Sequence, residues 1–456
     1  MRINKSPWIH QLDQSRKVVS LNQDLDTDIA IVGAGIAGIS TAFFILKYTN
    51  QRVVLLDQGK LAHGATGHNA GQVIARFEKP LHSLVKEFGF EKVKDALHGL
   101  HSGWNLIDEM YNDAGLDILF SRITGMRGFS DIHQVLLAIK DLEIENLSGL
   151  PSSEMLINEN APFKHLLPRV LEKFYRFVPH VEILSRLETE DKNFHALVTE
   201  QAACMNSALF CQEVVVYLSN KFSSRFSFYE NTHIIKTVLK KNYVLLDAGK
   251  HTINASRVIL CTNGFENIEI FNEDGLAIDK RFHHLVNGRV GYMSGYLENL
   301  NKPAAAVSYY IPDNDPSNDV PDPYFYLTRR PHEMGDVKHN LVCAGGPEVT
   351  IDDREEYLFD YDYPEKVQAD LDDFIKREYN PEPNKKIDYE FTWHGLMGYT
   401  PNRVRLIGEE PKNKVLLYNL GCNGIGIIPS VYGGRRIARI IAGERVRESI
   451  FDPRSE

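Results

Sequence analysis

The clearest pattern of apolar residues in the chain is a βαβ unit that begins near residue 28. Nearly continuous apolar runs at 29–32 and 52–56 are typical of strands buried in a parallel sheet. A glycine turn follows the first run and leads into a segment at 36–47 with helical character. The pattern therefore predicts the start of a parallel sheet.

Apolar residues further along the chain predict one long helix and more strands. The helix is expected at 93–111, where apolar side chains recur at alternating intervals of four and three and form one stripe. We expect this helix to pack across a sheet. Strands are expected at 243–246 and 257–260. Residues 266–340 combine Pro, Asn, Asp and aromatic residues with short strand-like runs, which predicts a separate, partly antiparallel β layer.

The N-terminal arm, up to residue 26, is polar and irregular. The residue before a proline is biased away from the helical conformation, so Ser6-Pro7 argues against a helix in this arm. We expect the arm to lie on the surface as a leader.

The composition is that of a globular protein with a substantial core, since 43% of the 456 residues are hydrophobic and 25% are charged. A net charge of -10 without a long run of one sign disfavours nucleic acid as a partner. The five cysteines are scattered without metal or disulfide spacing, which fits a reducing cytoplasm and predicts no metal site. We expect neither export nor an integral membrane segment, while peripheral membrane contact stays open.

A glycine motif in the βαβ unit has the spacing of a dinucleotide-binding site. Gly33-Ala-Gly35-Ile-Ala-Gly38 lies between the first strand and the first helix. Its glycines allow a tight turn and close approach of a pyrophosphate, and the helix N-terminus supplies N–H groups to the phosphates. Asp57 ends the second strand, where an acidic side chain can bind ribose hydroxyls. An ordinary strand-to-helix turn is the alternative, and the motif alone does not separate FAD from NAD.

A second glycine-rich segment, Gly64-Ala-Thr-Gly-His-Asn-Ala-Gly71-Gln72, follows the second strand. Its side chains are too small to build a core, whereas its backbone N–H groups can lie along phosphates or the edge of an isoalloxazine ring. The segment therefore favours FAD over NAD. A surface loop is the alternative.

Further motifs occur in the second half of the chain. They are Ile259-Leu-Cys-Thr-Asn-Gly264, Leu341-Val-Cys-Ala-Gly-Gly346, Trp393-His-Gly-Leu-Met-Gly-Tyr-Thr-Pro-Asn402 and Gly421-Cys-Asn-Gly-Ile-Gly426. Together with the two glycine segments they resemble, in order, the D-amino-acid, glycine and sarcosine oxidase superfamily of FAD-dependent oxidoreductases. Within it, the aromatic-bearing arm and the Asn-Ala-Gly-Gln run look most like the gamma-glutamylputrescine oxidoreductase group.

The resemblance implies an α/β fold with a Rossmann-like, discontinuous FAD-binding domain and a second α+β substrate domain built on a mixed or antiparallel sheet. The FAD-binding domain is expected at 27–117, 197–265 and 393–456, and the substrate domain at 118–196 and 266–392, after the arm at 1–26. Asp57 is expected at the ribose and the backbone near Ile235 at the adenine. The expected FAD-binding residues are Gly33, Gly35, Ile36, Ala37, Gly38, Asp57, Gln58, Gly64, Ala65, Thr66, His68, Asn69, Ala70, Gly71, Gln72, Val73, Ile235, Thr262, Asn263, Gly264, Trp393, Gly395, Gly398, Gly424, Ile425, Gly426 and Ile427.

Several positions depart from the family's pattern. Asn402 replaces the usual aspartate and Arg405 replaces a proline, so this loop is expected to be held differently. Ile425 stands where many relatives have histidine. Gly395 stands where monomeric sarcosine oxidases carry the cysteine that links to the flavin, which implies that a thioether link is absent.

His68 falls where dimethylglycine and sarcosine dehydrogenases place the histidine that is bonded covalently to FAD. We expect non-covalent FAD, with His68 as a polar residue beside the flavin. A covalent link through His68 and a solvent-exposed loop histidine are the alternatives.

By resemblance, the chain is an FAD-dependent amine or amino-acid oxidase or dehydrogenase that oxidises a C–N bond by hydride transfer to flavin N5. The catalytic candidates are His68, Tyr326, Arg329 and His394; an arginine suits a substrate carboxylate, and a basic turn is the alternative for Arg329. The electron acceptor is expected to be oxygen or a quinone. Oxidation of a modified nucleic-acid base and a degenerate pocket with a binding or structural role are the alternatives.

Overall fold

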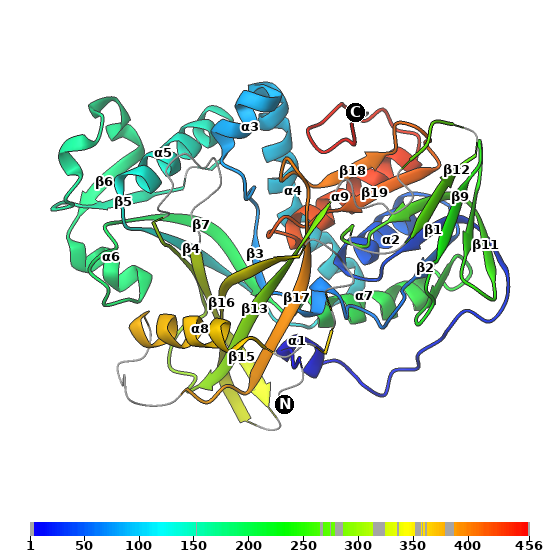
Figure 1. Cartoon of the computed structure of the whole chain (residues 1–456), viewed down its shortest axis with the longest axis horizontal. Coiled ribbons are helices and arrows are strands. Elements are labelled where there is room, and N and C mark those ends of the chain that lie inside the picture. Colours follow the sequence, from blue (N-terminus) through cyan, green and yellow to red (C-terminus); the bar gives the residue numbers. More distant parts are fainter. Residues whose placement is uncertain are drawn as a thin grey trace.

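Two mixed β-sheets with helices packed on them form the body of the molecule (Figure 1). The computed structural model describes residues 4–151, 153–264, 268–273, 275–278, 286–312, 324–334, 337–351, 357, 359–360, 363–378 and 387–454. In Figure 1 the sheet that contains the first strand lies on the right, and the second sheet lies at the centre and left. None of the helices in these ranges is both long enough and apolar enough to cross a membrane.

Within the described part of the chain, the first sheet has nine strands and a parallel centre. The main order is β12-β9-β10-β11-β1-β2-β8; β19 pairs with β11 and β18, and the edge formed by β9 and β10 is antiparallel. The strands are β1 (Leu25–Val32), β2 (Val53–Leu56), β8 (Phe226–Tyr229), β9 (Lys236–Leu239), β10 (Val244–Asp247), β11 (Thr252–Leu260), β12 (Glu269–Asn272), β18 (Leu406–Glu409) and β19 (Leu416–Leu420).

The predicted βαβ unit is confirmed at the centre of this sheet. β1 and β2 pair in parallel, and all residues of β2 are buried, as are residues 29–32 of β1. Strands buried on both faces carry continuous apolar runs, which is why the pattern could be read from the sequence. Helix α2 (Ile36–Tyr48) connects the two strands.

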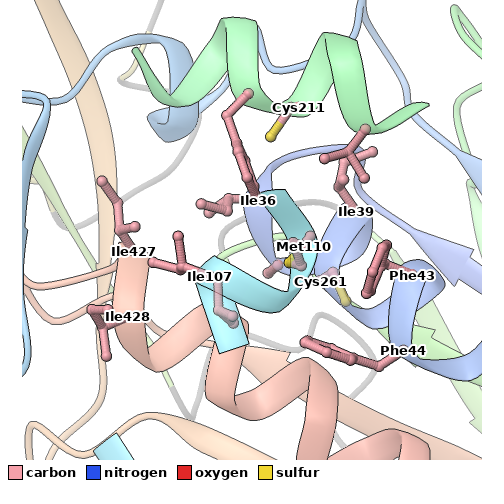
Figure 2. Packing of buried hydrophobic residues seen from close by; sticks show 14 of the residues in the cluster. Ile36, Ile39, Phe43, Phe44, Ile107, Met110, Cys211, Cys261, Ile427 and Ile428 are labelled. Carbon is pink, nitrogen blue, oxygen red and sulfur yellow. The ribbon is translucent and has the colours of Figure 1, made fainter. Parts of the chain in front are cut away.

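Four helices build the apolar layer beside this sheet: α2, α4 (Phe90–Ala114), α7 (Ser207–Lys221) and α9 (Ile427–Ile441). Figure 2 shows side chains from all four meeting in one cluster. The helix predicted at 93–111 is α4, but it packs chiefly against α9, which itself lies against β18 and β19. Gly99 and Gly103 allow this approach, since a Cβ at either position would come within 2.7 Å of α9 side chains.

The second sheet has ten strands within the described residues, in the main order β17-β13-β16-β15-β14-β4-β7-β5-β6, with β3 paired to β7. It is mostly antiparallel, with parallel pairs at β4–β14 and β5–β6. The strands are β3 (Gln72–Ile74), β4 (Phe120–Phe129), β5 (Met155–Asn158), β6 (Tyr175–Val178), β7 (Ala196–Met205), β13 (Asn287–Glu298), β14 (Ala305–Tyr310), β15 (Tyr324–Met334), β16 (Val337–Ile351) and β17 (Phe391–Tyr399). The remaining helices are α3 (Leu81–Phe88), α5 (Ile132–Leu147), α6 (His180–Leu187), α8 (Glu365–Glu378) and the short 3₁₀ segments Lys164–Leu166 and Arg169–Phe174. The expected fold class, with one Rossmann-like sheet and one mixed sheet, is confirmed.

Sheet membership differs from the expected domain ranges at four strands. β3, which lies inside the range 27–117 expected for the FAD-binding domain, pairs with β7 in the second sheet. β7 and β17, which fall almost entirely in ranges expected for the FAD-binding domain, pair in the second sheet, whereas β12, expected in the substrate domain, pairs with β9 in the first. β7, β12 and β17 lie near expected boundaries between the domains, whereas β3 does not. At these three strands the chain changes from one sheet to the other a few residues away from the points that motif positions suggested.

The N-terminal arm contains a short helix, α1 (Pro7–His10), where the sequence argued against one. The expectation was wrong because Pro7 occupies the first helical position, where its missing N–H costs nothing, and Ser6 caps the helix while staying extended. Trp8 in α1 has 0% exposed surface. The arm is therefore partly built into the core rather than being a surface leader.

Candidate functional site

A cavity of about 830 Å³ is lined by residues of both sheets. The first sheet contributes the turn after β1, the end of β2 with the loop behind it, and the turn after β11. The second sheet contributes residues of β13, β15, β16 and β17, and the loop before α9 completes the wall. This volume is in the range of sites for small molecules and cofactors.

The turn after β1 places the N-terminus of α2 at the cavity. Gly33 has φ +105°, and a Cβ there would come within 2.6 Å of the backbone oxygen of Cys261. Gly35 caps α2 without any side-chain hydrogen bond, and Gly35, Ile36 and Ala37 line the cavity. An uncapped helix N-terminus presents N–H groups and a partial positive charge, which suits a phosphate group.

Asp57 lies at the end of β2 beside this turn. Its Oδ2 accepts the N–H of Ala34 at 2.7 Å, and its Oδ1 accepts the N–H of Gly59 at 2.8 Å. Burial raises the pKa of the carboxyl group, although the two N–H donors act in the opposite direction. The side chain also lines the cavity, so the carboxylate is held rigidly where a hydroxyl donor can reach it.

The 64–72 loop begins with a 3₁₀ turn, Ala65–Gly67, that is tied to its surroundings on two sides. Thr66 Oγ1 accepts the N–H of Ile36 at 2.9 Å, which joins the loop to the start of α2. Ser207 Oγ donates to the backbone oxygen of Thr66 at 2.6 Å, and Asn69 Nδ2 donates to Ser207 Oγ at 2.8 Å. The loop is thus a fixed wall of the cavity, which contradicts the alternative of a free surface loop.

His68 in this loop is 7% exposed and lines the cavity. Its Nδ1 lies 2.9 Å from the backbone oxygen of Gly64, so Nδ1 carries the proton and donates it to that oxygen. Gly395 of β17 lies against His68, since a Cβ on the glycine would be 2.7 Å from the His68 backbone oxygen. Burial lowers the pKa of His68 to about 4, so the imidazole is uncharged near neutral pH.

Asn263 joins three segments at the far wall of the cavity. Its Nδ2 donates to the oxygen of Leu396 at 3.2 Å, and its Oδ1 accepts the N–H of Cys422 at 2.9 Å. The residue has φ +66°, a conformation that asparagine tolerates better than most residues. Beyond Cys422, α9 begins at Ile427 with Gly426 as its N-cap and no side-chain cap, so a second helix N-terminus meets the cavity.

Comparison with known proteins identifies the family. The family model described as DAO, FAD dependent oxidoreductase, matches residues 28–440. The chain belongs to this family. Its cofactor is accordingly FAD.

Individual relatives are distant in sequence. The protein named Probable oxidoreductase OrdL from Haemophilus influenzae is 20% identical over 451 residues, which are 98% of this chain and 90% of that protein. Gamma-glutamylputrescine oxidoreductase from Escherichia coli is 26% identical over 90 residues, 20% of this chain and 21% of that protein. The glycine oxidase of Geobacillus kaustophilus superposes with a TM-score of 0.65 at 15% identity, covering 94% of this chain and 98% of that one. The resemblance to the superfamily is confirmed across the chain, and that to the gamma-glutamylputrescine group over one segment.

The residues present in the cavity fit the cofactor of the DAO family. FAD has a pyrophosphate, and the N-terminus of α2, whose N-cap Gly35 has no side chain, meets the cavity with Gly35, Ile36 and Ala37 in its lining. Most of the expected cofactor residues line the same cavity. They are Gly33, Gly35, Ile36, Ala37, Asp57, Gln58, Gly64, Ala65, Thr66, His68, Asn69, Ala70, Gln72, Thr262, Asn263, Gly395, Gly424, Ile425, Gly426 and Ile427.

The other expected cofactor residues lie outside the lining: Gly38, Gly71, Val73, Ile235, Gly264, Trp393 and Gly398. The four glycines allow close packing of protein on protein; a Cβ on Gly398, for example, would meet the oxygen of Asn263 at 2.0 Å. Trp393 is buried edge-on to Trp8. The side chain of Ile235 is 46% exposed, and Thr232, His233 and Ile234 line the cavity in its place.

The catalytic candidates separate into two groups. His68 and Tyr326 line the cavity. Arg329 does not, because both of its terminal nitrogens bind the carboxylate of Glu188, at 2.7 and 2.6 Å, and its side chain is fully buried. The expectation that Arg329 meets a substrate carboxylate is therefore wrong. His394 also lies outside the lining, with its Nδ1 3.1 Å from the hydroxyl of Tyr357.

Arg405 is a functional candidate that the sequence analysis treated only as a departure from the family. Its side chain lines the cavity, and it donates to the side-chain and backbone oxygens of Asn419, each at 2.8 Å. Burial lowers its pKa to about 10, and the titratable groups that act on it are the thiols of Cys261 and Cys422 rather than carboxylates. A buried guanidinium without a carboxylate suits an anionic ligand. The sequence did contain a signal for this role of Arg405, namely a charged residue at a position where the family's pattern has a proline.

Glu348 and Tyr357 also line the cavity and were missed. Glu348 stands two residues beyond the motif at 341–346, so the motif ended just short of it. Tyr357 lies in a stretch with no recognisable pattern. No sequence signal pointed to either residue; Glu348 reaches the cavity through the pairing of β16 with β13.

Proposed function

We propose that this DAO-family protein oxidises a C–N bond of a small amine, with FAD as the acceptor of the hydride. The observation that carries the proposal is the extent of the cavity, which reaches from the phosphate-binding turn at Gly33 to the sheet face at Gly291 and Met293. The flavin ring is expected near the 64–72 loop and β17. The sheet face opposite then offers room for a small substrate beside the ring.

Bound FAD supplies a two-electron acceptor for the hydride that leaves the substrate carbon, while a proton leaves the nitrogen and water hydrolyses the resulting imine to a carbonyl compound and an amine. The chain's part is to bind and orient the substrate. The buried walls favour an uncharged amine at the reacting position, because a charged group loses hydration there. Only the uncharged amine has the lone pair that the oxidation requires.

The two catalytic candidates in the lining have distinct roles in this proposal. With a pKa of about 4, His68 is too weak a base to take a proton from an ammonium group near neutral pH. It therefore acts as an uncharged polar wall of the site. Burial raises the pKa of Tyr326, so its hydroxyl keeps the proton and can donate a hydrogen bond to the substrate.

Anaerobic reduction of the bound flavin tests the proposal. The holoenzyme is mixed with a panel of primary amines, secondary amines and amino acids, and the oxidised flavin absorption band is followed. We expect at least one amine to bleach the band, and oxygen or a soluble quinone to restore it. A flavoprotein that no member of the panel reduces, although dithionite does, would contradict the proposal and favour a binding or structural role.

A further inference from the structure

One end of the cavity is a row of residues across three strands of the second sheet. Glu348 of β16 is in register with Gly291 of β13, and Gly291 is in register with Gly395 of β17, which lies against His68. Adjacent strands are about 4.8 Å apart, so the Cα of Glu348 is roughly 10 Å from that of Gly395. A small molecule that reacts near Gly395 can therefore reach Glu348 with its other end.

Glu348 is surrounded by protein and still accessible. Burial raises the pKa of its carboxyl group, yet 31% of the side-chain surface is accessible, and the residue lines the cavity. Arg289 Nη1 lies 3.3 Å from Oε2, and the hydroxyl of Tyr399 donates to Oε1 at 3.3 Å. Two carboxylate oxygens can accept about four hydrogen bonds, so these donors leave capacity for a ligand.

The surroundings of Glu348 are aromatic and acidic. Tyr324, Tyr326, Tyr357 and Phe359 line the cavity with Glu348. The hydroxyl of Tyr324 lies 3.5 Å from Oε2 of Glu78, a second carboxylate behind this wall. Aromatic faces and carboxylates both attract cations, and the attraction is stronger where water is excluded.

Arg289 pairs with Glu348 itself. Three other arginines, Arg76, Arg329 and Arg330, are engaged elsewhere. Arg329 is bound by Glu188, and the guanidinium of Arg330 lies over the ring of Trp8 at 5.1 Å. Arg76 lies 3.5 Å from the hydroxyl of Tyr310 and 3.9 Å from Glu200, and it does not line the cavity. Among the described lining residues the arginine is Arg405, which belongs to the wall beside Cys261 and Cys422.

We propose that the substrate carries a second, positively charged amino group, which Glu348 and the surrounding tyrosines hold while the uncharged amine lies beside the flavin. The proposal rests on the proposed function and narrows its substrate class to diamines and longer polyamines. A substrate whose far end is a carboxylate would instead meet Glu348 and be repelled. The positive charge is recognised without being altered, so the oxidation itself is unchanged.

Three ligand series of matched length test this inference on the holoenzyme: n-alkyl monoamines, α,ω-diamines and ω-amino acids. Binding is measured by the perturbation of the oxidised flavin spectrum, and reduction is measured separately without oxygen. We expect diamines to bind at least tenfold more tightly than monoamines of the same length, and ω-amino acids to bind most weakly. Glu348→Gln should abolish the diamine preference, with little effect on monoamines.

Two further variants serve as controls. Glu348→Asp keeps the charge and should keep part of the preference, which separates recognition of charge from a general disturbance of the pocket. Glu333→Gln removes an exposed carboxylate on the same strand as Tyr326 and should change nothing.

The outcomes distinguish this inference from the proposed function. Equal binding of monoamines and diamines, or tighter binding of ω-amino acids, would overturn the inference even if amines reduce the flavin; the latter result would point to Arg289, which lies beside Glu348. A diamine preference that depends on Glu348, without reduction by any amine, would support recognition by Glu348 and overturn the proposed oxidation.

Discussion

The indole N–H of Trp8 donates a hydrogen bond of 2.6 Å to the backbone oxygen of Asn69, in the middle of the loop expected to line the flavin. The same ring lies against Gly71, where a Cβ would be 2.8 Å away, and edge-on to Trp393 at 6.5 Å between ring centroids. Asn4 adds a second connection, because its Oδ1 accepts the N–H of His394 at 3.0 Å. The N-terminal arm thus contacts both the 64–72 loop and β17.

Replacing Trp8 should therefore weaken FAD binding as well as the fold. We expect Trp8→Ala to lower the free energy of unfolding by about 3–5 kcal/mol, because a buried ring is lost, and to raise the Kd of FAD. Trp8→Phe keeps most of the ring and should cost about 1–2 kcal/mol, because Asn69 loses its donor. Thermal unfolding of the apoprotein and titration with FAD measure the two effects. Unchanged FAD affinity in folded Trp8→Ala would refute this role of the arm.

Gly33→Ala and Gly64→Ala form a matched pair on two walls of the cavity. At Gly33 a Cβ would be 2.6 Å from the oxygen of Cys261 and φ is +105°, whereas at Gly64 no atom lies within 4 Å and φ is -82°. We expect Gly33→Ala to distort the phosphate-binding turn and to lose most bound FAD. Gly64→Ala, whose Cβ meets no protein atom, should lose less FAD than Gly33→Ala. The ratio of flavin to protein absorbance in the purified variants checks this prediction, which fails if both variants retain FAD equally.

Arg405→Leu tests whether the buried guanidinium serves the cofactor. We expect the Kd of FAD to rise at least tenfold, because an anionic ligand loses its charged donor in a buried site. The free energy of unfolding of the apoprotein should change less than the free energy of FAD binding, since a buried cation without a carboxylate partner contributes little to stability. Arg454→Gln removes an arginine with 57% side-chain exposure and serves as the control. Wild-type FAD affinity in Arg405→Leu would show that the residue is structural.

The buried His68 should make stability depend on pH. Its pKa is about 4 in the folded protein, against an ordinary value near 6.5, so the unfolded chain binds the proton more tightly. The contribution of His68 to the free energy of unfolding is therefore present in full above about pH 6.5. It is lost as the pH decreases toward 4, which lowers the free energy of unfolding by up to about 3 kcal/mol. His332, whose pKa is also lowered to about 4 by burial, acts in the same direction. Denaturant unfolding of the apoprotein at pH 7.5 and 5 should show a smaller difference for His68→Asn than for the wild type.

Acid precipitation tests how FAD is attached. Nδ1 of His68 is engaged with the oxygen of Gly64, and Gly395 has no thiol that could form the thioether link that the resemblance to monomeric sarcosine oxidases led us to consider. We expect all yellow colour to pass into the supernatant when the protein is precipitated with acid. Colour that stays in the pellet of the wild type and disappears in His68→Ala would instead establish a covalent bond through His68.

The sequence by itself determined the βαβ unit, the glycine turn and the segments that line the cofactor cavity. These features depend on local rules: continuous apolar runs mark buried parallel strands, and glycine supplies the positive φ that the turn at Gly33 requires. Later glycine motifs such as 424–426 were recognisable for the same reason. Their order along the chain was sufficient to assign the cofactor class.

Only the tertiary structure decided which partners the side chains in and around the cavity have. Arg329 was expected at the substrate, but its guanidinium binds the carboxylate of Glu188, which is 141 residues away in sequence. Glu348 reaches the cavity because β16, β13 and β17 pair in one register, and Trp8 reaches the 64–72 loop because the N-terminal arm folds into the core. Local patterns determine the backbone conformation of a segment. The partners and burial of a side chain depend on segments far away in the sequence, and these set the charge of the site.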